Sequence, residues 1–253
     1  MKADGTPTPQ FAELGHQSTP LGELSLRRRH VLSLHRDVYE VKLGDEYLMS
    51  SLFTDSETEL GRMGVAAGQT APPRREDSGS AGIDLVVGGL GLGNTAAAVL
   101  GYREVRSLLV VDLFDAVIDW HQRGIVPLGH TVSGDPRCRL ICGDFFERAM
   151  SEDGFDPDSP GRRHDAILVD IDHAPDELLD DSHADCYEPS GLTKIRSHLC
   201  DGGIFGVWSD KPPDQLFVSR LSGVFSSASP HPVTFENPLR GDMYTQTVHL
   251  ARR

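Results

Sequence analysis

The pattern of hydrophobic and polar positions changes near residue 83 of this chain. Before that point, residues 21–49 hold short runs in which apolar and polar side chains alternate, which predicts a small antiparallel sheet. Residues 56–67 then predict a helix. Ser56 and Glu59 have the spacing of a capping box, so we expect the helix to begin there.

After residue 83, short apolar runs alternate with helical segments. Strands are expected over residues 84–87, 107–111, 139–142, 166–169 and 203–208, and helices over 94–100, 115–124, 145–150, 190–199 and 214–224. This alternation predicts an α/β fold, a parallel sheet with helices on both faces. Two last strand-like runs, 233–236 and 245–250, predict an antiparallel hairpin at the sheet edge.

The same patterns divide the chain into segments. Residues 1–20 are polar and contain three prolines, so we expect a mobile tail. Residues 21–67 form the small β-rich region with its helix, and residues 68–82 are a linker rich in Pro, Gly, Ser and charge. Residues 83–253 form the α/β domain.

A glycine cluster follows the first strand of the α/β domain. Its glycines are Gly88, Gly89, Gly91 and Gly93. Asp112 ends the next strand, near the spacing of about 20 residues at which a nucleotide-binding βαβ unit places the acid that binds ribose. Because Gly91, Gly93 and Ala96 also fit the G-x-G-x-x-G/A dinucleotide pattern, NAD is an alternative ligand.

Acids also follow the third and fourth predicted strands. We expect Asp144 to accept from an adenine amino group while Phe145 or Phe146 covers the ring, and Asp170 to face the reacting end, because ligands of open α/β sheets bind beyond the carboxyl ends of the strands. The segment 170–188 contains eight acids and no Lys or Arg, which favours a cationic substrate. The His and Cys residues there match no closed zinc pattern, so no metal is expected.

Composition narrows the class of protein further. With 24 basic and 38 acidic residues, the net charge is −14, which argues against nucleic acid and membrane surfaces as partners. The four cysteines include no C-x-x-C pair, and we interpret them as reduced. The first residues lack the hydrophobic core of a signal peptide, so we expect a cytoplasmic protein.

The successive motifs GGLGLG, VVDL, CGDFF, HDAILVDID and LCDGGIFGVWS resemble those of the spermidine synthase-like family, related to the polyamine aminopropyltransferases. The resemblance implies the Rossmann-like fold of S-adenosylmethionine-dependent methyltransferases, preceded by a small β region. It also implies S-adenosylmethionine or its decarboxylated form as co-substrate. The implied cofactor residues are Gly88, Gly89, Gly91, Gly93, Asp112, Asp144 and Phe145. Asp170 and Asp172 would be catalytic, and Asp45, Glu46 and His173 would contact the acceptor.

The chain departs from the family where the acceptor binds. The family motif D-S-S-D-P is replaced by Asp170-Ile-Asp172-His173-Ala-Pro. The motif that begins with Asp45 and Glu46 also lacks its later polar partners. Aminopropyl transfer to a small-molecule amine, methyl transfer to another acceptor, and a non-catalytic or NAD-linked binding role therefore stay open. The chain is also compatible with a homodimer.

Overall fold

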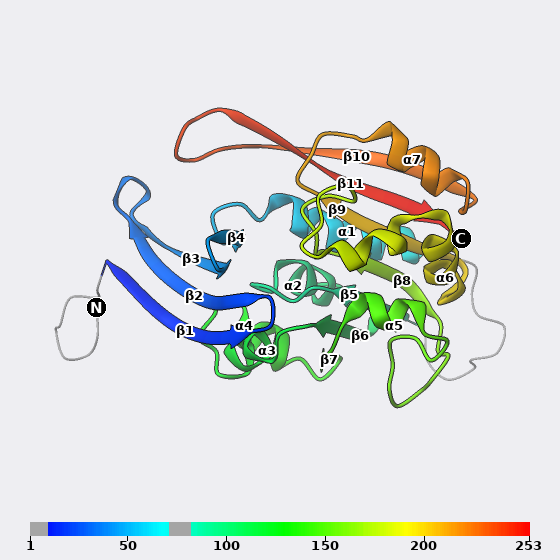
Figure 1. Cartoon of the computed structure of the whole chain (residues 1–253), viewed down its shortest axis with the longest axis horizontal. Coiled ribbons are helices and arrows are strands. Elements are labelled where there is room, and N and C mark those ends of the chain that lie inside the picture. Colours follow the sequence, from blue (N-terminus) through cyan, green and yellow to red (C-terminus); the bar gives the residue numbers. More distant parts are fainter. Residues whose placement is uncertain (1–9, 71–81) are drawn as a thin grey trace.

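The computed structural model describes residues 10–70 and 82–253. Residues 1–9 of the predicted tail and 71–81 of the predicted linker lie outside the described residues. The described chain forms a small antiparallel sheet, a connecting helix and a large mixed sheet covered by helices on both faces (Figure 1). The α/β fold with a preceding β region is therefore confirmed.

The small sheet is an antiparallel meander. Its strands are β1 (Phe11–Thr19), β2 (Gly22–Val31), β3 (Arg36–Leu43) and β4 (Glu46–Ser50), with a 3-10 turn, η1 (Leu32–Leu34), before β3. The expectation of a mobile tail over residues 1–20 is wrong for its second half, which forms β1. This strand pairs with β2, and Gln17 donates a hydrogen bond to Asp115 of the large domain at 2.7 Å. These are long-range contacts that the polar composition does not reveal.

The large sheet has the strand order β10-β11-β9-β8-β5-β6-β7. Its strands are β5 (Ile83–Gly88), β6 (Val105–Asp112), β7 (Cys138–Cys142), β8 (His164–Val169), β9 (Leu199–Ser209), β10 (Ser227–Glu236) and β11 (Met243–Arg252). The five strands from β5 to β9 run parallel, and β10 and β11 form the antiparallel edge hairpin. The predicted hairpin is therefore confirmed, with both strands longer than the apolar runs suggested.

Helices cover both faces of this sheet. They are α1 (Asp55–Gly68), α2 (Asn94–Leu100), α3 (Asp115–Gln122), α4 (Gly129–Ser133), α5 (Phe145–Met150), α6 (Pro189–Ser197) and α7 (Gln215–Ser222), with a 3-10 segment, η2 (Asp181–Tyr187). The first four pack on one face together with the small sheet, around a core that includes Leu60, Leu85 and Val110. The last three pack on the other face, around Val86, Ile167 and Phe205. Only the short α4 has no counterpart among the predicted helices.

The small sheet lies against the carboxyl ends of the parallel strands (Figure 1). Met49 of β4 reaches the glycine cluster, where the main-chain N–H of Leu92 donates to Met49 Sδ at 2.7 Å. Across the described residues, no helix is both long and apolar enough to cross a membrane. The arrangement encloses the strand ends between two layers, and the candidate site lies there.

Candidate active site

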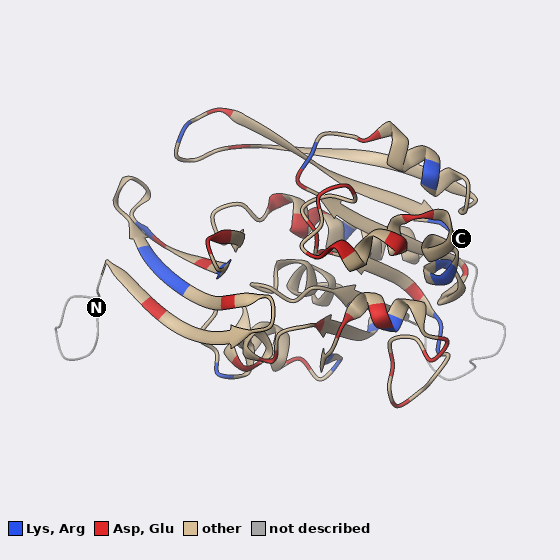
Figure 2. Cartoon of the chain, in the orientation of Figure 1, with Lys and Arg blue, Asp and Glu red and all other residues tan. Residues whose placement is uncertain are grey.

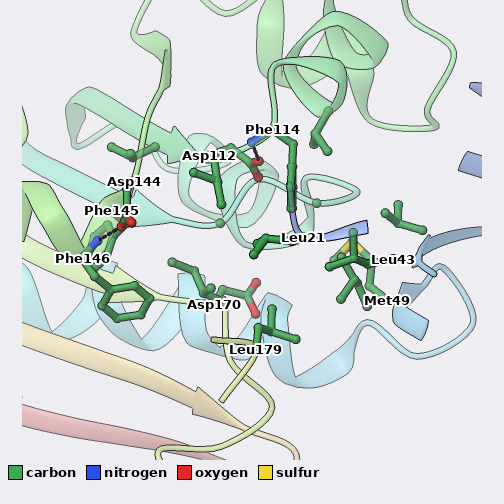
Figure 3. Close-up of a pocket in the computed structure, with 18 of the residues that line it drawn as sticks. Leu21, Leu43, Met49, Asp112, Phe114, Asp144, Phe145, Phe146, Asp170 and Leu179 are labelled. Atoms are coloured by element: carbon green, nitrogen blue, oxygen red, sulfur yellow. Dashed lines mark hydrogen bonds between the residues drawn. The ribbon is translucent and has the colours of Figure 1, made fainter. Parts of the chain in front are cut away.

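Two adjoining cavities lie between the small sheet and the strand ends. The first cavity is bordered by the glycine cluster, by three strand-end acids and by apolar side chains of the small sheet (Figure 3). The acids are Asp112, Asp144 and Asp170. None of the described residues that line the first cavity is Lys or Arg. A ligand with a positive charge therefore suits this cavity better than one with an anionic end.

The glycine cluster adopts a conformation that side chains would obstruct. Gly89 has φ +89°, and a Cβ at this position would lie 2.1 Å from the main-chain oxygen of Asp170. Gly91 has φ +45°, and its Cβ would lie 2.3 Å from Met49 Sδ. Gly89 and Gly91 both border the first cavity. Gly93, the residue before α2, and Gly88, packed beneath Phe145, instead shape the loop from behind.

Asp112 ends β6 and joins two loops at the floor of the cavity. Its Oδ2 accepts a hydrogen bond from the Leu90 N–H at 2.8 Å, and its Oδ1 accepts from the Phe114 N–H at 2.9 Å. Burial raises the pKa of Asp112, while these main-chain hydrogen bonds act in the opposite direction. The carboxylate borders the cavity, where its remaining lone pairs suit a ribose diol.

Asp144 and the two phenylalanines after it form the far end of the first cavity. Asp144 Oδ1 caps α5 by accepting from the N–H groups of Phe146 and Glu147, at 2.7 and 3.1 Å. Phe145 is buried, and its ring packs edge-on against Phe146. The second oxygen of Asp144 and the aromatic wall beside it are suited to an adenine ring and its amino group.

Asp170 follows β8 and faces the first cavity from the side of α1. Thr95 Oγ1 lies 2.6 Å from Asp170 Oδ2 and donates a hydrogen bond to it. Burial raises the pKa of Asp170, and the hydrogen bond from Thr95 opposes this. A carboxylate with a raised pKa is a stronger base than an exposed one, which suits it to accept a proton.

Asp172 has a different place from the one expected. It is 2% exposed and does not border either cavity. Its Oδ1 lies 2.8 Å from His183 Nδ1, and its Oδ2 accepts from the Tyr187 hydroxyl at 2.9 Å. Asp172 therefore anchors the 170–188 segment, and the expectation of a catalytic role is corrected, because its hydrogen-bonding capacity is directed into the protein.

The three residues predicted to contact the acceptor substrate do not all lie at one cavity. Glu46 of β4 and His173 meet, with Glu46 Oε1 3.0 Å from His173 Nε2. His173 borders the second cavity. Asp45 is exposed in the turn before β4 and borders neither cavity, so its expected contact with the acceptor is corrected.

The second cavity lies between the small sheet and the β10–β11 hairpin. Leu48 and Met49 border both cavities, so the two cavities adjoin at these side chains. Its other lining side chains include acidic, basic and aromatic residues: Arg29, Glu40, Tyr47, Phe53, Glu57, Trp208, Asp210, Phe235, Arg240 and Tyr244. The second cavity therefore has room for a second molecule beside a ligand in the first one.

Sequence reasoning missed Glu57, a buried acid in the first turn of α1 that borders the second cavity. The capping-box interpretation was also wrong, because the residue before the helix is Thr54 and Ser56 is buried inside the first turn. A glutamate next to a serine at a helix start is ordinary on a protein surface. Only the packing of α1 against Asp170 distinguishes it.

No protein-family model matches this sequence. Among solved structures, a spermidine synthase in complex with the transition state analogue AdoDATO aligns with a TM-score of 0.68 and 13% identity, over 95% of this chain and 73% of that chain. The spermidine synthase from Thermotoga maritima aligns with a TM-score of 0.66 and 13% identity, over 95% and 72%. A probable spermidine synthase from Corynebacterium glutamicum ATCC 13032 aligns with a TM-score of 0.61 and 12% identity, over 97% and 81%.

The chain therefore has the spermidine synthase fold, and the resemblance that the motifs carry is confirmed at the level of the fold. In the described part of the chain, no three His, Cys, Asp or Glu side chains come together in a way that could hold a metal ion. What the site does follows from its own geometry.

Proposed function

We propose that this protein is a transferase that moves the aminopropyl group of decarboxylated S-adenosylmethionine to a small-molecule amine. The observation that carries the proposal is the convergence of Asp112, Asp144 and Asp170 with the glycine cluster around one apolar cavity that adjoins a second. The likeness to a spermidine synthase in complex with a transition state analogue supports the same ligand class.

The charge of the first cavity favours the decarboxylated donor over S-adenosylmethionine. The carboxylate of S-adenosylmethionine calls for a cation or several N–H donors, and the described lining offers no Lys or Arg. In the same loop, the Leu92 N–H donates its hydrogen bond to Met49 Sδ and not toward a ligand carboxylate. Decarboxylated S-adenosylmethionine carries no carboxylate that would be left without a partner. Its terminal ammonium group is attracted by the carboxylate of Asp170.

The chemistry asks little of the protein beyond position and proton removal. The nitrogen lone pair of the amine attacks the methylene next to the sulfonium, and the C–S bond breaks with its electron pair left on sulfur. The two adjoining cavities would hold donor and acceptor in line, which supplies most of the rate enhancement. Asp170 would accept the proton that the amine must lose before it attacks.

Calorimetry with four ligands tests the ligand class. We expect decarboxylated S-adenosylmethionine and methylthioadenosine to bind, and S-adenosylmethionine to bind more weakly. Binding of S-adenosylmethionine alone would favour a methyltransferase. Binding of NAD alone would favour the interpretation of the glycine cluster as a dinucleotide-binding motif. Mass detection of an aminopropylated amine, from a panel of primary amines, then tests the reaction.

Replacing Asp170 tests the proton acceptor. Asp170→Asn keeps the shape but removes the base, so turnover with an amine should fall by about 10²- to 10⁴-fold, while methylthioadenosine affinity changes little. Asp181→Asn, an exposed acid of the same segment, is the matched control and should retain turnover. Full turnover in Asp170→Asn would assign proton acceptance to another group.

A further inference from the structure

A buried carboxyl group lies behind Asp170 and takes no part in the chemistry described above. Glu57 is 7% exposed and borders the second cavity, while Asp170 borders the first. Thr95 links the two: its Oγ1 lies 2.6 Å from Asp170 Oδ2 and 3.1 Å from the main-chain oxygen of Glu57. The charge of Asp170 also acts on the Glu57 carboxyl group, so the two form one electrostatic cluster, with Glu57 at the second cavity and Asp170 at the first.

The hydrogen bonds around Ser56 show where a proton must be. The indole N–H of Trp208 can only donate, and it lies 2.8 Å from Ser56 Oγ. Gln246 Nε2 donates to Asp210 Oδ1 at 2.7 Å, which directs Gln246 Oε1 toward Ser56 Oγ, 2.5 Å away. Because an amide oxygen only accepts, the single hydroxyl hydrogen of Ser56 belongs to this contact.

One contact of Ser56 is then left without a hydrogen from serine. Glu57 Oε2 lies 3.0 Å from Ser56 Oγ, and a carboxylate there would set two acceptor oxygens against each other. A carboxylic acid resolves this, because Glu57 then donates its own O–H to Ser56. Reversing the amide of Gln246 gives no escape, since its oxygen would then face the carboxylate of Asp210.

Burial points to the same protonation state. Removal from water raises the pKa of Glu57 well above its ordinary value, and the nearby charge of Asp170 raises it further. The other charged and titratable groups on the helical turn of Glu57 or lining the second cavity are Asp55, Arg29, Glu40, Tyr47, His173, Asp210, Arg240 and Tyr244. Arg29, the cation on β2, is 2.8 Å from Glu40 and is engaged there.

We propose that, without a bound ligand, Glu57 and Asp170 share a single proton, which resides on Glu57. An acceptor amine that enters as an ammonium ion displaces this proton. The amine role rests on the function proposed above, whereas the protonation of Glu57 does not. The second cavity would thus take a cationic acceptor in exchange for a proton. Glu57 would then face the amine from the second cavity, and Asp170 would face it from the first, where the two cavities adjoin.

The proton balance closes over one turnover. On binding, the O–H bond of Glu57 breaks and its proton leaves to solvent, so the ammonium ion lies beside two carboxylates. The ammonium then passes one proton to Asp170, and the neutral amine forms its new N–C bond as the C–S bond of the donor breaks. The product leaves as a secondary ammonium ion, and the proton left on Asp170 restores the single proton of the pair.

The protonation of Glu57 is tested in the protein without any ligand. Infrared spectroscopy near pH 7 should show the C=O band of a buried carboxylic acid, lost in Glu57→Gln and retained in Asp55→Asn, an exposed acid of the same helical turn. Glutamine is the neutral isostere of the acid and can donate to Ser56 in its place. Absence of the band in the unmodified protein overturns the proposal whether or not a variant folds.

The pH dependence of stability gives a second measure. The native state keeps a proton that the unfolded chain loses above the ordinary carboxyl pKa of 4.5. The free energy of unfolding should therefore fall as pH rises from that value through the raised native pKa, and this fall should be smaller in Glu57→Gln. Parallel profiles for the two proteins would overturn the assignment.

The displacement is tested by calorimetry with primary amines from methylamine to spermidine, in two buffers of different ionisation enthalpy. About one proton should be released for each amine bound, and none in Glu57→Gln. Amine binding without proton release, or no binding by any amine in the panel, overturns the displacement. Because this readout needs no donor, proton release without aminopropyl transfer would refute the proposed function and leave the displacement standing.

Discussion

The carboxylate of Asp112 stabilises the fold and, in the function proposed above, would also bind a ligand. Its two oxygens accept hydrogen bonds from the main-chain N–H of Leu90, in the glycine loop, and of Phe114, in the loop after β6. Each carboxylate oxygen accepts more than one hydrogen bond, so a ribose diol can be added without loss of these contacts. The residue therefore presets the loop that a nucleoside would meet.

The first prediction concerns this residue. Asp112→Ala should remove charged hydrogen bonds worth about 1.5–3 kcal/mol to an adenosyl ligand, so affinity should fall about tenfold or more. Calorimetry with methylthioadenosine measures the change. Asp119→Ala, an exposed acid on neighbouring α3, is the control. An unchanged dissociation constant in folded Asp112→Ala would refute the ribose assignment.

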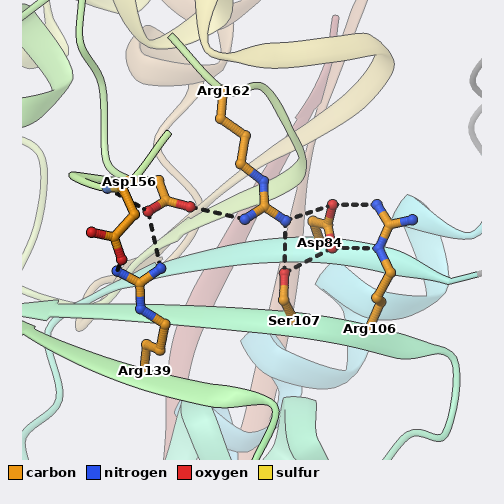
Figure 4. Close-up of polar contacts among 7 residues, drawn as sticks. Asp84, Arg106, Ser107, Arg139, Asp156 and Arg162 are labelled. Atoms are coloured by element: carbon orange, nitrogen blue, oxygen red, sulfur yellow. Dashed lines mark hydrogen bonds and ion pairs between the residues drawn. The ribbon is translucent and has the colours of Figure 1, made fainter. Parts of the chain in front are cut away.

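At the scale of elements, charges tie the amino ends of the parallel strands together, opposite the candidate site (Figure 4). Arg162 bridges two buried acids: it lies 2.9 Å from Asp84 of β5 and 2.9 Å from Asp156. Arg106 of β6 also pairs with Asp84. Burial alone would raise the pKa of Asp84, but hydrogen bonds from Arg106, Ser107 and Arg162 outweigh it and lower the pKa.

The second prediction concerns this network. Arg162→Ala leaves Asp84 and Asp156 short of a partner and should lower the free energy of unfolding by about 3 kcal/mol. The lowered pKa of Asp84 stabilises the fold above the ordinary carboxyl pKa of 3.8, and this is lost as pH falls through the native value. In denaturant unfolding, the free energy of unfolding should therefore fall less steeply with decreasing pH in Arg162→Ala than in the unmodified protein. The exposed neighbour Arg163→Ala is the control, and equal stability of both variants would contradict the prediction.

At the scale of the whole molecule, the net charge of −14 is unevenly spread. Figure 2 shows basic residues on β2 and acidic residues in the 170–188 segment. The three arginines of β2, Arg27, Arg28 and Arg29, each pair with an acid of the small sheet. Lys211, which follows β9, pairs with Asp176 and Glu177 of the 170–188 segment. The excess charge of the molecule remains negative and favours the approach of cations.

The third prediction follows from this charge. When ionic strength rises from about 0.01 M to about 1 M, the screening length falls from about 30 Å to about 3 Å. The affinity for spermidine should then weaken several-fold and more than that for methylamine. Methylthioadenosine, which is uncharged, is the control ligand. Equal salt dependence for the two amines in calorimetry would show that long-range charge plays no part.

Local patterns were enough to predict much of this protein. Alternating apolar runs predict the parallel sheet, and the glycines between β5 and α2 predict a sharp loop. In a parallel sheet, residues that follow successive strands meet at one edge. Asp112, Asp144 and Asp170 therefore come together as expected, because their positions depend only on where strands end.

Other features depend on contacts between distant segments, and only the tertiary structure decided them. Phe11–Thr19 becomes a strand because β2 offers a partner. Asp172 turns inward because His183 and Tyr187 satisfy it there. Glu57 becomes a buried acid because α1 packs against the end of β8 and the edge hairpin. Burial and hydrogen-bond partners are properties of the packed chain, so a pattern of neighbours along the sequence does not contain them.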